Sequence, residues 1–109
     1  MIELSVIALS SLKEKSIGLI GKTKIEPVLF KTHFGIHTFG MKQAIDVLIL
    51  DEENRVVKLK ENLKPNRLWF WNLKYEKVVE LPGGTIEEQK IRRGSQIKVI
   101  EKQTKSKEF

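Results

Sequence analysis

The sequence predicts a mainly β protein, either a compact antiparallel β-sandwich or a partly closed barrel with two short helices. Short apolar runs rich in β-branched residues recur at close intervals along the 109 residues. Turn-forming residues separate most of these runs, and the helical patterns are short. Closely spaced strands favour antiparallel pairing, and several of them favour a sandwich or a barrel.

The first half of the chain contains four predicted strands. Ile2–Ala8 is rich in β-forming residues. Pro27–Phe30 and Ile36–Phe39 are shorter, and a turn at Gly35 separates them. Ile45–Leu50 is the strongest candidate for a strand, because every residue in it except Asp46 is apolar.

The second half begins with a hairpin, in which the polar residues Asp51–Asn54 turn the chain into the alternating strand Arg55–Lys60. The proline in Asn62–Arg67 predicts a loop. Further extended segments are expected at Leu68–Trp71, Tyr75–Leu81 and Gln96–Glu101.

Two capping-box patterns predict the helices, because a hydroxyl is followed three positions later by a carboxylate. The pattern at Ser11–Glu14 predicts a helix from about Leu12 to Gly21. The second pattern, at Thr85–Glu88, predicts a helix that ends near Ile91.

The length predicts one domain, over residues 1–102, followed by a polar tail at 103–109. The net charge of +6 lies entirely in the second half. Residues 1–55 hold seven basic and seven acidic side chains, whereas residues 56–109 hold thirteen basic and seven acidic ones. Such asymmetry indicates either an anionic partner such as nucleic acid or a solvated, lysine-rich exterior.

The absence of cysteine excludes disulfides, iron–sulfur clusters and thiol catalysis. The apolar stretches are too short for a membrane-spanning helix, which needs about 20 residues. The acidic start at Met1–Leu4 differs from a secretory signal. We therefore expect a cytoplasmic protein with no membrane partner.

Two separated segments carry a family resemblance. The segments Ile36–Lys42 and Ile45–Val47 together resemble the first signature of the domain of unknown function 192 family. Val79–Thr85 resembles its Glu-Leu-Pro-small-Gly segment, and Gln43-Ala44 replaces an aromatic–proline pair. The resemblance runs from about residue 9 to residue 100. It implies a mainly antiparallel β fold with short helices, and it implies no activity or cofactor.

Asp46 is the most informative polar residue, because the strand around it is apolar on both faces and is therefore expected to be central. A buried carboxylate needs hydrogen bonds or a counter-charge. Lys42 or His37 could supply the counter-charge, or the carboxylate could bind the Gly40–Gln43 turn as a structural element. The alternative is a pocket-lining acid. The candidate ligand-binding residues are His37, Thr38, Met41, Lys42, Asp46 and Glu80.

Metal-binding and catalytic interpretations have less support. His33 and His37 are four residues apart, but their segment is predicted to be strand–turn–strand, so the two rings need not converge. A third ligand would have to be Asp46 or Glu80, which could also form an acid–base pair. We expect no metal and no cofactor, and we leave open a metal-dependent or acid–base hydrolase.

The segment Lys64–Tyr75 combines both tryptophans with basic residues, as a face that binds single-stranded nucleic acid or a sugar does. The rings could instead fill the core beneath a loop, as large rings usually do. Alternation along an extended segment places Trp69 and Trp71 on one face and Phe70 on the other. The candidate nucleic-acid contacts are Arg67, Trp69, Trp71, Lys74, Arg92 and Arg93.

The sequence therefore favours a non-enzymatic binding module for a small polar ligand or a macromolecular partner such as a protein. The alternatives are an RNA- or DNA-binding module and a hydrolase.

Overall fold

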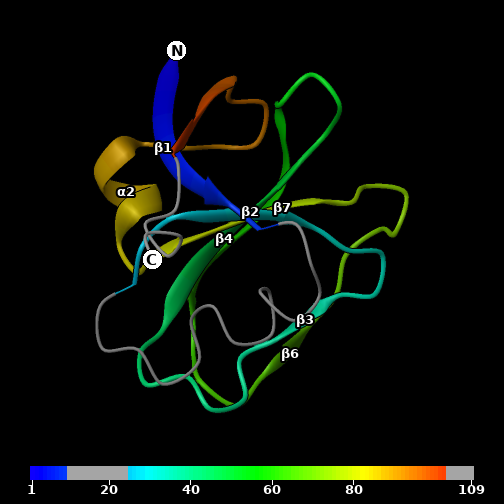
Figure 1. Ribbon diagram of the computed structural model, residues 1–109, viewed down its shortest axis with the longest axis vertical. Coiled ribbons are helices and arrows are strands. Elements are labelled where there is room, and N and C mark those ends of the chain that lie inside the picture. Colours follow the sequence, from blue (N-terminus) through cyan, green and yellow to red (C-terminus); the bar gives the residue numbers. More distant parts are fainter. Residues whose placement is uncertain (10–24, 103–109) are drawn as a thin grey trace, which may run out of the picture.

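The computed structural model describes residues 1–9 and 25–102, and most of its strands form one mixed sheet (Figure 1). The six strands lie in the order β5-β4-β7-β2-β1-β8, and β3 and β6 form a separate pair. The strands are β1 (Ile2–Ala8), β2 (Val28–Lys31), β3 (Ile36–His37), β4 (Ile45–Leu50), β5 (Val56–Leu63), β6 (Leu68–Trp69), β7 (Lys77–Pro82) and β8 (Ile97–Lys102), and helix α2 spans Thr85–Gln89. The predicted mainly β fold class is confirmed.

Strand β4 is central and covered on both faces, as its composition predicts. All six of its residues are buried. It pairs antiparallel with β5 on one side and with β7 on the other. The antiparallel part of the sheet therefore contains the hairpin expected from the polar turn at Asp51–Asn54.

Two hydrophobic clusters lie on opposite faces of this sheet. The first contains Ile45, Val47 and Ile49 of β4 and is covered by Ile36 of β3. The second contains Leu48 and Leu50 and is covered by helix α2. Figure 1 shows the helix and the β3–β6 pair on opposite sides of the sheet. The sheet is thus the middle layer.

Strand β1 departs from the expected antiparallel pattern, because it pairs in parallel with both β2 and β8. A parallel pair needs a long crossover connection, and residues 9–27 separate β1 from β2. Local strand patterns do not report such long connections, and for this reason the sequence did not reveal the direction of pairing.

The two edges of the sheet meet at one end. Arg55, next to edge strand β5, forms an isolated bridge with Gln96, next to edge strand β8. The backbone amide of Val56 donates to Ser95, and that of Ile97 donates to Asn54. The sheet is therefore strongly curved and closed at this end, although it is not a complete barrel.

Several element ends differ from the sequence prediction. Strand β5 continues to Leu63, and the extended region before the second tryptophan shortens to Leu68–Trp69. The capping box at Thr85 does not form. Gly84 is the N-cap residue with φ 92°, and the Thr85 hydroxyl donates instead to the carbonyl of Pro82.

The predicted helix from Leu12 to Gly21 and the tail 103–109 lie outside the described residues. The described part of the chain contains no helix that is long and apolar enough to cross a membrane.

Candidate binding surface

Asp46 is fully buried, and its carboxylate binds two backbone amides. The first oxygen accepts from the amide of Asn62 at 2.9 Å, and the second accepts from the amide of Ile86 at 2.8 Å. Asn62 has φ 56° and lies where β5 gains a residue relative to β4. Ile86 is in the first turn of α2. From strand β4, the carboxylate thus stabilises a β-bulge in β5 and caps helix α2.

The structure divides the predicted ligand-binding residues between the two faces of the sheet. Asp46 pairs with Leu81 and shares the helix-covered face with it. Glu80 is the next residue along β7, so its side chain points to the opposite face. The arrangement does not join these two acids as an acid–base pair. Lys42 and His37 are exposed, and within residues 1–9 and 25–102 the Asp46 carboxylate contacts neither of them.

Thr38 connects the end of β3 to the turn that leads into β6. Its backbone amide donates to the carbonyl of Arg67 at 2.9 Å, and its carbonyl accepts from the amides of Asn66 and Met41. Its hydroxyl donates to the carbonyl of Lys64 at 2.6 Å and accepts from the amide of Arg67 at 2.9 Å. This fully buried threonine therefore holds the β3–β6 layer together.

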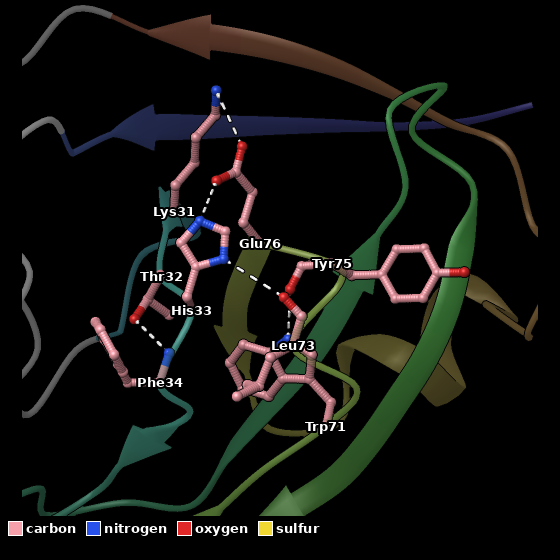
Figure 2. A network of polar contacts seen from close by, with 8 residues as sticks. All are labelled: Lys31, Thr32, His33, Phe34, Trp71, Leu73, Tyr75 and Glu76. Atoms are coloured by element: carbon pink, nitrogen blue, oxygen red, sulfur yellow. Dashed lines mark hydrogen bonds and ion pairs between the residues drawn. The ribbon is translucent and has the colours of Figure 1, made fainter.

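His33 connects the end of β2 to the loop before β7 through contacts of both its ring nitrogens (Figure 2). Its Nε2 lies 2.9 Å from Oε1 of Glu76, and Nζ of Lys31 lies 3.8 Å from the other carboxylate oxygen, Oε2. Its Nδ1 lies 3.4 Å from the carbonyl oxygen of Leu73. Figure 2 shows the ring of Phe34 pointing away from this network.

The two histidines serve different local roles. Nδ1 of His37 accepts from the amide of Phe39, and the His37 imidazole stacks on the Phe39 ring with the two centroids 4.9 Å apart. His33 faces Glu76 instead. In the part of the chain that the structure describes, no group of three or more His, Asp or Glu side chains could hold a metal ion.

The tryptophans face inward, whereas the residues that alternate with them face outward. Trp71 is buried, and its indole N–H donates to the carbonyl of Tyr75 at 2.7 Å. Trp69 is half-buried and packs against the first cluster. Leu68 and Phe70 are 59% and 55% exposed. The alternation predicted for this segment is confirmed, with the tryptophans on the core side.

Five exposed side chains lie on strands β3 and β6 or within two residues of them, and we call this set the aromatic strip. Cross-strand pairing places His37 opposite Leu68. A Cβ added at Gly35 would lie 2.5 Å from the Phe70 ring, so this ring covers the glycine backbone. Phe34 is 81% exposed and Phe39 is 47% exposed. The aromatic strip comprises Phe34, His37, Phe39, Leu68 and Phe70.

Basic side chains border the aromatic strip. Lys58 Nζ lies 3.4 Å from the carbonyl oxygen of Phe70 and 5.3 Å from the centroid of the Trp69 ring. Arg67 directly precedes Leu68, and one of its guanidinium nitrogens donates to the carbonyl of Pro65 at 3.2 Å. The segments 31–42 and 58–77 together hold eight Lys and Arg against two Glu.

The candidate nucleic-acid contacts do not share one face. Arg67 and Lys74 flank the β3–β6 side, whereas Trp71 is buried. Arg92 and Arg93 are exposed in the turn after α2, and this turn hydrogen-bonds to Val56 at the end of the sheet where the two edges meet. Only part of this predicted set is therefore available to one ligand.

A family model places the protein among known sequences. The model described as DUF192, an uncharacterized ACR, matches residues 2–99. The chain belongs to the DUF192 family. No curated protein matches this DUF192 chain.

Two solved structures share the fold of this DUF192 protein. One is a chain from Sinorhizobium meliloti 1021 that was proposed as a transcription regulator, with a TM-score of 0.70 and 16% identity, covering 84% of this chain and 78% of that one. The other is a protein of unknown function from Novosphingobium aromaticivorans DSM 12444, with a TM-score of 0.67 and 17% identity, covering 82% of this chain and 70% of that one. At these identities the likeness concerns the fold alone.

The two segments that carry the DUF192 resemblance meet at Asp46. The first segment contains Asp46, and the second leads into α2, whose Ile86 amide binds the carboxylate. The aromatic strip, in contrast, includes Phe34 and Phe70, which the sequence did not single out as contacts. The available signal was their position beside Gly35 and between two tryptophans, but sequence spacing does not show that these two segments are adjacent.

Proposed function

We propose that this protein is a non-enzymatic binding module that holds a macromolecular partner on the aromatic strip. The observation that carries the proposal is the grouping of exposed apolar side chains on and beside the paired strands β3 and β6. Contiguous exposed apolar surface on a small protein is characteristic of interaction sites, whereas scattered apolar residues are not. Rings with few rotatable bonds also lose little conformational entropy when they bind.

The layer beneath the strip supports this interpretation, because it is held in place before any partner arrives. The hydrogen bonds of Thr38 fix the entry to β6, and the 2.9 Å contact of His33 with Glu76 fixes the segment before Phe34. A preorganised surface retains more of its contact energy as affinity.

The position of the buried acids favours binding over acid–base catalysis. Asp46 is occupied by two backbone amides, and Glu80 points to the other face of the sheet. A general acid–base pair needs both groups within reach of one substrate. The strip itself offers stacking and apolar contact.

An extract-binding experiment tests the proposal. Immobilised wild-type protein and the Phe34→Ser/Phe70→Ser variant are incubated with a total extract that is divided into untreated, nuclease-treated and protease-treated samples. We expect the wild-type protein to retain a macromolecule that the double variant loses. Ile100→Ser is the matched control, because Ile100 is an exposed apolar residue on β8.

The outcome is decisive in both directions. Retention by wild type and Ile100→Ser, but not by the double variant, supports the strip as the binding surface. Equal retention by all three proteins, or no specific retention at all, would overturn the proposal. Thermal unfolding of each variant checks that the substitutions leave the fold intact.

A further inference from the structure

We propose that the partner held on the aromatic strip is single-stranded nucleic acid, an inference that rests on the proposed function and specifies its ligand. The bases would stack on the exposed rings, and the phosphates would face the basic border. Two independent features of the β3–β6 side, ring geometry and charge, point to this ligand.

The rings are arranged as a stacking platform. Phe39 is already stacked with His37, with an interplanar angle of 21°, and the outer face of that pair is exposed. One edge of the Phe70 ring lies so close to Gly35 that a Cβ there would collide with it. Unpaired bases stack on exposed aromatic rings with little dependence on sequence, because every base has a π-face.

The charge around the rings is complementary to a phosphate backbone. Of the two acids in the segments 31–42 and 58–77, Glu76 is engaged by Lys31 and His33. Lys58 and Arg67 lie beside the strip itself. Cations that contact phosphates release condensed counterions, which provides affinity that does not depend on sequence.

The same charge argues against other occupants. A second copy of this chain would bring an identical basic border against the first, because a twofold interface apposes the same patch on both subunits. Stacking also requires unpaired bases, which a duplex does not offer. Helix α2 has five residues and lies on the other side of the sheet, so it does not present a groove-reading element beside the strip.

Fluorescence anisotropy with labelled oligothymidylate and oligouridylate of about 12 nucleotides tests the inference directly. We expect the wild-type protein to bind both, and to bind a duplex of equal length more weakly. Phe34→Ser/Phe70→Ser should weaken binding by about tenfold per ring. The Kd should rise steeply between about 50 and 200 mM salt.

A pair of charge variants localises the contact. Lys58→Gln/Arg67→Gln removes two cations beside the strip, and Arg92→Gln/Arg93→Gln removes two from the turn after α2. The first variant should reduce the slope of log K against log salt by about 0.7 per cation, as expected for single strands. The second should leave both the slope and the effect of the phenylalanine substitutions unchanged.

The possible failures can be told apart. Binding that survives Phe34→Ser/Phe70→Ser but is lost in Arg92→Gln/Arg93→Gln would overturn the inference by placing the nucleic acid elsewhere. No oligonucleotide binding, together with strip-dependent retention of a protease-sensitive partner, would overturn the inference and leave the proposed function intact. Self-association abolished by the phenylalanine substitutions, without oligonucleotide binding, would also overturn it. Failure in both the extract and the oligonucleotide experiments would overturn both proposals.

Discussion

Asp46 shows how one buried charge can have a structural role. It interrupts an apolar strand, yet each carboxylate oxygen accepts a hydrogen bond from a backbone amide that lacks a local partner. The amide of Asn62 is at a bulge, and that of Ile86 is in the first turn of a short helix. A carboxylate serves both donors at once, which an apolar side chain cannot do.

Replacing Asp46 should therefore lower the stability much more than replacing Asp51, whose hydrogen bonds to backbone amides are exposed. Asp46→Ala leaves one buried and one partly buried backbone donor without this acceptor, and it should lower the free energy of unfolding by about 3 kcal/mol. Asp51→Ala is the matched control, because Asp51 also accepts from two backbone amides, those of Glu53 and Arg55, but in an exposed turn. Urea denaturation compares the two, and equal losses would contradict the buried-capping role.

Thr38 provides a second test at the same scale. Thr38→Val keeps the shape but removes the hydroxyl that joins Lys64 and Arg67. The loss of this buried bridge should destabilise the protein by about 2 kcal/mol. Thr38→Ser keeps the hydroxyl and should recover most of that loss in thermal unfolding; no difference between the two variants would contradict the bridging role.

Among the elements, the β3–β6 pair depends on a glycine at a place where ring and backbone meet. Gly35 has φ 89°, and an added Cβ would lie 2.5 Å from the Phe70 ring and 2.9 Å from the carbonyl oxygen of Trp69. Gly94 has the same φ but nothing within 4 Å of such a Cβ. An alanine would therefore adopt the same unfavourable backbone conformation at both positions, but its Cβ would collide with neighbouring atoms only at Gly35.

The difference between Gly35→Ala and Gly94→Ala therefore measures the packing of the strip. Both substitutions should cost about 1 kcal/mol for the left-handed backbone. Gly35→Ala should cost at least about 1 kcal/mol more, because the carbonyl of Trp69 cannot move away as a flexible side chain can. Chemical denaturation gives both values, and equal costs would show that neither the Phe70 ring nor the Trp69 carbonyl lies against this glycine.

Helix α2 shows how an element can depend on a distant residue. It has five residues, too few to be stable alone, and Gly84 offers no side chain to cap it. The cap comes from Asp46, 40 residues earlier in the chain. Asp46→Ala should therefore loosen α2 specifically. Relative to the wild-type protein, the substitution should accelerate hydrogen exchange at the Ile86 amide more than at the β8 amides.

For the whole molecule, curvature joins the two edges of the sheet. The segments beside β5 and β8 meet through the Arg55–Gln96 bridge, whereas β4 and β7 lie inside the sheet with partners on both sides. Local opening should begin where hydrogen bonds are fewest and most exposed.

Native-state hydrogen exchange should therefore rank the strands by position. The amides of β4 and β7 should exchange only through global unfolding, whereas those of β3 and β6, which form a two-stranded pair of two residues each, should exchange first. Slower exchange in β6 than in β4 would contradict this order.

The sequence by itself determined the strands, the buried character of β4, the hairpin turn and the alternation of the two tryptophans with Phe70, but not which side of that segment faces the core. Alternation and apolar runs report these features because they are local consequences of a side-chain period of two. They also located Asp46 as an anomaly. They did not identify its partners, because the amides of Asn62 and Ile86 lie 16 and 40 residues away.

Only the tertiary structure decided the parallel pairing of β1, the separation of Asp46 from Glu80 and the assembly of the aromatic strip. Each depends on which distant segments pair, and pairing is set by long connections and by total packing. A residue's own neighbours determine which face it occupies. Which residues pack against that face is determined by the rest of the chain.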